Sequence, residues 1–131
     1  MKIENILTLI GINHHFISHY SKTHWGFSIL IMGKKGECFA RLYQYDDEKD
    51  VVYLDWLSVD ENSRKQGVGT ELQKIREEIG RKLGATTSCL WVKKDTWMYN
   101  WYKRRGYEDW KDNKNEDNAI WMKKTLVQSS I

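Results

Sequence analysis

A short stretch of glycines and basic residues is the part of the chain best suited to bind phosphate. It reads Arg64-Lys65-Gln66-Gly67-Val68-Gly69-Thr70 and lies directly before a long amphipathic segment. Two glycines let the backbone approach a ligand closely, because no Cβ intervenes. The first amides of a helix have no intrahelical acceptor and lie at the positive end of the helix dipole. The sequence therefore predicts a pyrophosphate cradle, beside which Arg64 and Lys65 add positive charge.

Two common phosphate-binding motifs do not fit this stretch. A dinucleotide fingerprint requires a third glycine, but Leu72 occupies that position, and the strands predicted before it are antiparallel. A P-loop requires Gly-Lys followed by Ser or Thr, which these residues do not provide. The ligand therefore belongs to another class of phosphate-bearing molecule.

The stretch resembles the acetyl-CoA loop of the GNAT superfamily, whose pattern is Arg/Gln-x-x-Gly-x-Gly/Ala. Here the pattern is Arg64-x-x-Gly67-x-Gly69, after a predicted strand and before a predicted helix. The family also shows an Asn, an apolar residue three positions later, a Tyr seven positions later, and Gly-Phe soon after. The matching residues are Asp95, Met98, Tyr102 and Gly106-Tyr107. The resemblance covers roughly residues 26 to 126 and implies an acetyl-CoA-dependent N-acetyltransferase.

This resemblance implies a set of cofactor-binding residues. Backbone groups on the strand before the loop would pair with the pantetheine arm, the loop amides would hold the pyrophosphate, and Asp95, which replaces the usual Asn, would lie near the pantetheine. The residues concerned are Leu57, Val59, Arg64, Gln66, Gly67, Val68, Gly69, Thr70, Asp95 and Tyr102.

The same resemblance assigns a proton donor for the leaving thiolate but does not identify the group that takes the proton from the amine. Attack of an amine on the thioester expels a thiolate, which the phenol of Tyr102 would protonate, while the amide of Leu57 would stabilise the oxyanion. Some relatives carry a catalytic Glu where this chain has Tyr53, so Asp55, on the same strand face, is the candidate acceptor of the amine's proton. The alternatives are a packing role for Tyr102, a structural role for Asp55, and proton removal through water.

The elements that position these residues can be read from apolar periodicity. We predict helices over residues 3–10, 13–20, 68–83 and 96–105, and strands over residues 27–32, 37–45, 51–59, 87–92, 107–110 and 119–126. In the second helix, Phe16, Ile17 and Tyr20 would point inward. The fold class is α+β, a GNAT fold with a twisted, mixed, mostly antiparallel sheet flanked by helices. We expect it to lack the family's first strand. Residues 1–131 would form one domain, with short helices over 1–24 on the acceptor side and a flexible tail over 127–131.

Composition narrows the class of protein. The chain has 131 residues, a formal charge of +3, and no apolar run near the roughly 20 residues of a membrane helix. The N-terminal residues lack signal-peptide features, so a cytoplasmic protein without membrane contact is expected. Cys38 and Cys89 are predicted to be buried, reduced thiols. His15 and His19 lie four apart without an evident third ligand, so no metal site is predicted.

Several functions remain open from the sequence alone. The acceptor would be a primary amine of a small molecule or a protein, or the amino group of an aminoacyl-tRNA. A catalytically inactive acetyl-CoA-binding module is the main alternative. Residues 91–110 interleave basic and aromatic side chains, a pattern that can also bind RNA, although nucleic acid is the less favoured partner. A homodimer is possible, but no interface is indicated.

Overall fold

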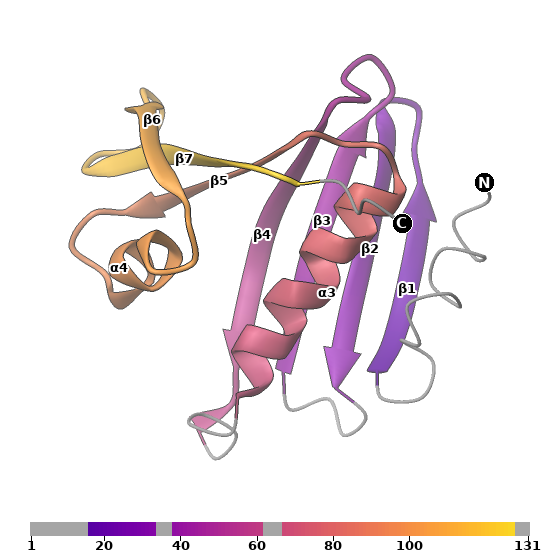
Figure 1. Ribbon diagram of the computed structural model, residues 1–131, viewed down its shortest axis with the longest axis horizontal. Coiled ribbons are helices and arrows are strands. Elements are labelled where there is room, and N and C mark those ends of the chain that lie inside the picture. Colours follow the sequence, from indigo (N-terminus) through magenta and orange to yellow (C-terminus); the bar gives the residue numbers. More distant parts are fainter. Residues whose placement is uncertain (1–15, 34–37, 62–66, 128–131) are drawn as a thin grey trace.

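The computed structural model describes residues 16–33, 38–61 and 67–127. Its sheet has seven strands in the order β1-β2-β3-β4-β5-β7-β6 (Figure 1). All neighbouring strands are antiparallel except β4 and β5, which are parallel. The elements are β1 (Phe16–Lys22), β2 (Gly26–Gly33), β3 (Cys38–Tyr45), β4 (Val51–Val59), α3 (Val68–Lys82), β5 (Thr87–Lys93), α4 (Trp97–Lys103), β6 (Glu108–Asp112) and β7 (Ala119–Thr125).

The core lies between α3 and the sheet. In β3 every second side chain is buried, and α3 packs across β3 and β4 (Figure 1). The helix contributes Leu72 and Ile79, neither of which is exposed. The second helix, α4, packs against β5. Alternation in the strands and a helical apolar stripe thus account for how these elements assemble.

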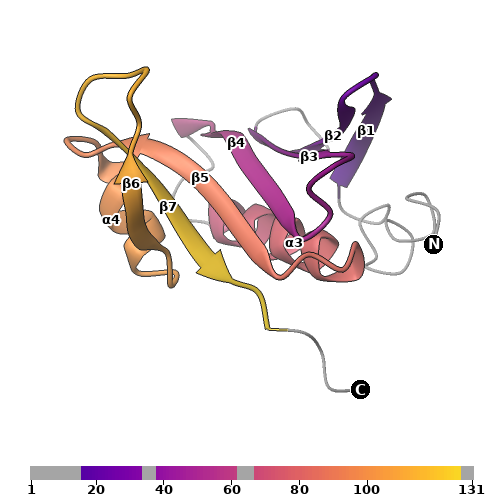
Figure 2. The ribbon, with the colours of Figure 1, turned by 90° about the horizontal axis from the view of Figure 1, so that it is seen from above.

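The sheet opens between β4 and β5. In the part of the chain that the structure describes, β4 and β5 pair at three positions: Val51 with Thr87, Val52 with Ser88, and Tyr53 with Cys89. Beyond these pairs the two strands run apart, as Figures 1 and 2 show from two directions. The splay leaves the second half of β4, which carries Asp55, Leu57 and Val59, without β5 beside it. A gap of this kind gives an extended ligand backbone groups to pair with.

Two predictions about the N-terminal part are wrong. Residues 16–22 form β1, which pairs along its whole length with β2, so these residues are not helical and the sheet does not lack a strand before β2. Tyr20 is 43% exposed instead of pointing inward, with its ring 5.7 Å from that of Phe27. A short apolar stretch fits both periods, and pairing with the edge of β2 favours the strand. The helix predicted over residues 3–10 lies outside the described residues.

The other predicted elements are confirmed, with ends that shift by at most two residues. Of the tail predicted over 127–131, only Val127 is described, and its carbonyl accepts a hydrogen bond from Arg81 Nε at 2.8 Å. Residues 128–131 lie outside the described part. None of the described helices has the length and apolar character needed to cross a membrane.

Candidate functional site

The glycine segment forms the start of α3. Gly67 is the N-cap residue and has φ = 78°, a left-handed conformation that favours glycine. The first helical hydrogen bond runs from Glu71 N to Gly67 O, so the amides that precede it face outward from the helix end. A Cβ on Gly69 would lie 3.4 Å from Val59 Cγ2, which shows how closely α3 approaches the end of β4. Arg64 and Gln66, predicted to contribute here, lie outside the described residues.

A β-bulge distorts β4 at the splay. Phe39 pairs with Ser58, and Arg41 pairs with Asp55, so β4 holds one more residue than β3 between these two pairs. Trp56 lies in the bulge with φ = 53°, one of two non-glycine residues with positive φ in the described chain. Bulges interrupt the ladder and re-aim backbone and side chains, often beside functional sites. The distortion therefore falls on the part of β4 predicted to meet the pantetheine arm.

Tyr102 is a buried residue of α4 whose hydroxyl contacts α3. It is 4% exposed, and its hydroxyl oxygen accepts a hydrogen bond from Nη2 of Arg76 at 2.9 Å. Its ring packs edge-on against Trp101 and Tyr107 at centroid distances of 4.9 and 5.4 Å. The aromatic neighbours fix the ring, whereas the hydroxyl belongs to a polar network.

The sequence placed Arg105 only within the basic and aromatic stretch of residues 91–110, a candidate RNA-binding pattern, whereas in the structure it connects α4 to the start of α3. Its Nη2 donates to Thr70 Oγ1 at 2.8 Å, and its guanidinium carbon lies 3.6 Å from the Trp101 ring centroid. Burial lowers the pKa of Arg105, and its Nε has no hydrogen-bond partner among the described residues. A positive charge is thereby added beside the amides at the helix start, where an anion would be favoured. The sequence signal for this anion-binding role is the run of basic residues at positions 103–105.

Sequence reasoning gave no role to Arg76, although its position in α3 carries a signal. It follows Leu72 by four residues and precedes Ile79 by three, so a cation occupies the apolar stripe of the helix. Arg76 is fully buried, and its Nη1 donates to the carbonyls of Arg41 and Asp55 at 3.2 Å each. These contacts join α3 to the bulge of β4.

The side chains of the two predicted acidic site residues, Asp55 and Asp95, make no hydrogen bond with Tyr102 among the described contacts. Both carboxylate oxygens of Asp55 accept hydrogen bonds from Arg41, one of them from Nε at 2.7 Å. This pairing raises the pKa of Arg41, chiefly through the hydrogen bond to Asp55. Asp55 alternates with the buried Leu54, so its side chain lies on the sheet face away from α3. Asp95 is exposed in the turn after β5.

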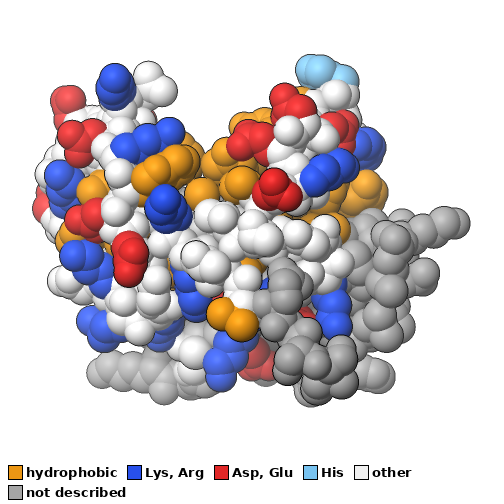
Figure 3. Space-filling view, turned by 45° about the horizontal axis from the view of Figure 1, so that its top comes forward, with side chains coloured by type: hydrophobic (Ala, Val, Ile, Leu, Met, Phe, Trp, Pro, Cys, Tyr) orange, Lys and Arg blue, Asp and Glu red, His pale blue; other side chains and the backbone are white. Residues whose placement is uncertain are grey.

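The sheet face away from α3 carries a cluster of aromatic rings at the start of the splay. Tyr43 and Tyr53 stack with centroids 5.2 Å apart, and Tyr53 meets Trp121 at 6.0 Å. Trp25 and Tyr45 pack against the same cluster. Burial is the main cause that raises the pKa of Tyr43 and of Tyr53, so both phenols are neutral at physiological pH. Figure 3 shows hydrophobic side chains gathered around a hollow in the molecular surface.

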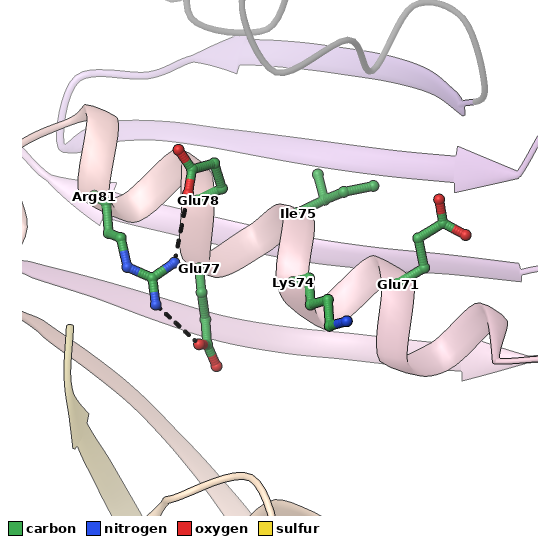
Figure 4. A pocket seen from close by; sticks show the side chains of 6 residues that line it. All are labelled: Glu71, Lys74, Ile75, Glu77, Glu78 and Arg81. Carbon is green, nitrogen blue, oxygen red and sulfur yellow. Dashed lines mark ion pairs between the residues drawn. The ribbon is translucent and has the colours of Figure 1, made fainter. Parts of the chain in front are cut away.

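A separate shallow pocket of about 420 Å³ lies along α3 and is lined mostly by charged side chains (Figure 4). Arg81 pairs there with Glu77 and Glu78 at 3.6 Å each. The lining residues are Glu71, Lys74, Ile75, Glu77, Glu78 and Arg81. They include none of the residues predicted to bind a cofactor, so the splay is the better candidate site.

Comparisons with known proteins agree with this geometry. The model of the acetyltransferase (GNAT) family matches residues 20–107. Ard1 from Thermoplasma volcanium is 20% identical, with a TM-score of 0.64 over 77% of this chain and 71% of that one. Tetrahymena GCN5 is 15% identical, with a TM-score of 0.63 over 82% and 72%. An acetyltransferase from Bacillus cereus is 18% identical, with a TM-score of 0.60 over 95% and 85%. No curated protein matches the sequence.

Proposed function

Because the chain belongs to the acetyltransferase (GNAT) family, we propose that it transfers an acetyl group from acetyl-CoA to a primary amine. The amine attacks the thioester directly in a ternary complex, without a covalent enzyme intermediate. The observation that carries the proposal is the splay of β4 from β5, because the start of α3 closely approaches the end of β4, and Arg76 links the Tyr102 hydroxyl to the Asp55 carbonyl of that strand.

The residues present suit acetyl-CoA. The amides of Val68, Gly69 and Thr70 at the helix start, with Arg105 beside them, favour a pyrophosphate. The backbone of Leu57 and Val59 beyond the bulge suits the amide groups of a pantetheine arm, which would extend the sheet like one more strand. When bound, acetyl-CoA supplies the activated acetyl group.

The proposed chemistry uses groups on both faces of the sheet. The acceptor amine enters from the face away from α3, where the aromatic cluster and Asp55 lie. Tyr102 protonates the departing thiolate from the side of α3. Asp55 accepts the amine's proton, directly or through water. A proton that reaches Asp55 neutralises the carboxylate and so weakens its ion pair with Arg41, and we therefore expect Asp55 to contribute less than Tyr102.

A calorimetric titration with acetyl-CoA, followed by a thiol-release assay with pooled amine acceptors, tests the proposal. We expect saturable binding and acceptor-dependent release of CoA. The pool contains small amines, lysine peptides, peptides with free N-termini and aminoacyl-tRNA, so the responding class identifies the acceptor. Binding without release from any class would favour an inactive acetyl-CoA-binding module. Absence of binding would overturn the proposal.

Gly67→Trp tests the phosphate cradle. An indole at the helix start would cover the outward-facing amides, so acetyl-CoA binding should be lost. Gly84→Trp is a matched control, because Gly84 follows the other end of α3 and has φ = 86°, and because a Cβ at either glycine would meet no atom of the described residues within 4 Å. Both variants carry the same backbone strain, and only Gly67→Trp should lose binding. Equal behaviour of the two would contradict the assignment of the cradle.

A further inference from the structure

Arg76 is a buried cation without a direct counterion. Its exposed surface is 0%, and no ion pair involves it within the described part of the chain. The neighbouring carboxylate, Glu77, pairs with Lys124 Nζ at 2.9 Å and reaches Arg76 only through Gln73. A charge in this position is costly unless hydrogen bonds or function compensate for it.

The two ends of the guanidinium serve different parts of the molecule. Nη1 holds the carbonyls of Arg41 and Asp55 at the bulge, which is a structural contact. Nη2 donates to the side-chain oxygen of Gln73 and to the Tyr102 hydroxyl. In the part of the chain that the structure describes, Nε has no hydrogen-bond partner. One planar group therefore fixes the distance between the bulge of β4 and the phenol of Tyr102.

The hydrogen bond from Nη2 also determines what the phenol can do. A phenol has one O–H to donate and can accept through its oxygen lone pairs. Because the oxygen of Tyr102 accepts from Arg76, its hydrogen is left to point elsewhere, and none of the described residues accepts it. The oxygen satisfies a buried donor of Arg76, and the hydroxyl hydrogen is available for a ligand.

We propose that Arg76 is a positioning residue for the proton donor. By donating to the Tyr102 oxygen it directs the hydroxyl hydrogen toward the splay between β4 and β5, and its charge stabilises the phenolate that forms there. The inference rests on the proposed acetyl transfer. In that step the carbon–sulfur bond of the thioester breaks, and its electron pair goes to sulfur. The hydroxyl proton of Tyr102 moves to the sulfur, giving free CoA thiol and a Tyr102 phenolate, which regains a proton from solvent.

The charge of Arg76 acts where it is most effective. A hydrogen bond from a cation to an oxyanion is stronger than one to a neutral phenol, so the contact strengthens as the proton leaves. Burial increases this difference, because little water screens the pair. The contribution should therefore affect kcat and leave the binding of acetyl-CoA almost unchanged.

A double-mutant cycle of kcat tests the inference, with Tyr102→Phe, Arg76→Gln and the double variant. Tyr102→Phe should lower kcat by about 100-fold, as loss of a general acid does. Arg76→Gln should lower kcat by about tenfold or more, with the acetyl-CoA dissociation constant within about threefold of wild type. In the double variant the loss should equal that of Tyr102→Phe alone, because Arg76 acts through the phenol. Losses that multiply would overturn the inference.

Other variants keep the result interpretable if Arg76→Gln folds poorly. Gln73→Met removes one partner of Nη2 and leaves the contacts of Nη1 to the strands intact, so it should lower kcat and be silent when combined with Tyr102→Phe. Arg76→Lys keeps the charge and should recover part of the lost kcat. Arg81→Gln, on the outer side of the same helix, should retain wild-type kcat.

The two proposals fail in different ways. A wild-type protein that releases no thiol refutes the proposed function itself. An active wild-type protein, together with a double variant whose loss of kcat is the product of the two single losses, refutes only the role of Arg76.

Discussion

At the residue scale, Asp55 has a structural partner and a proposed chemical role. Arg41 occupies both carboxylate oxygens, and its guanidinium carbon lies 3.9 Å from the Trp56 ring centroid. If Asp55 accepts the amine's proton, Asp55→Asn should lower kcat/KM by about tenfold or more at neutral pH. Steady-state rates with the acceptor class that responds best measure the effect. Arg41→Gln, which frees the carboxylate, should retain activity better than Asp55→Asn. A rate within threefold of wild type for both variants would make the ion pair purely structural.

A second residue-scale prediction concerns Cys89. Burial raises the pKa of its thiol to about 11, and the residue is 2% exposed. Since the thiolate is the reactive species, alkylation by iodoacetamide at pH 8 should be slow in folded protein and fast in urea. Peptide mass spectrometry after timed quenching measures the modification. Rapid labelling of the Cys89 peptide in folded protein would contradict the burial described here. Slow labelling would also mean that the thiol-release assay has little background from Cys89.

At the element scale, the sequence predicted most of the sheet and both described helices because their periodicity is clear. It failed at residues 16–22, where Phe16, Ile17 and Tyr20 fit a helical period but pair as a strand with β2. The loop at Gly67 was predictable, because two glycines and the first helical turn are local in sequence. The contacts of Arg76 and Arg105 were not predicted, because their partners Tyr102 and Thr70 lie 26 and 35 residues away in sequence.

Gly26 provides an element-scale prediction at the start of β2. A Cβ here would lie 2.0 Å from the Gln44 carbonyl oxygen and 2.9 Å from Tyr45 Cα, so the backbones of β2 and β3 would have to separate. Gly26→Ala should lower the free energy of unfolding by about 3 kcal/mol, near the upper range of overpacking costs. Gly84→Ala is the control, because it meets no atom within 4 Å and should cost only about 1–2 kcal/mol for its positive φ. Urea titration compares the two, and equal costs would contradict the close approach.

At the scale of the whole molecule, a buried polar network joins the two parts that the splay separates. Glu77 on α3 accepts from Tyr107 Oη at 3.1 Å and pairs with Lys124 of β7 at 2.9 Å. Tyr107 Oη in turn lies 2.8 Å from Ser88 Oγ of β5. Because β4 and β5 share only a short paired stretch, these bonds connect α3 to the second half of the sheet and leave the splay open for a ligand.

Glu77→Ala tests the importance of this network for the fold. Removing the carboxylate leaves Lys124 without its partner and removes a hydrogen-bond acceptor from Gln73 and Tyr107, so we expect a loss of about 3–5 kcal/mol in the free energy of unfolding. Glu78→Ala is the matched control on the same helix. Among the described residues the Glu78 side chain, which is 39% exposed, pairs only with Arg81 and Lys82, so the change should stay within about 1 kcal/mol. Urea unfolding followed by tryptophan fluorescence and by far-ultraviolet circular dichroism measures both variants. The wild-type transitions should coincide, because the network makes the two parts unfold together. Equal effects of the two substitutions would mean that apolar packing alone holds the parts together.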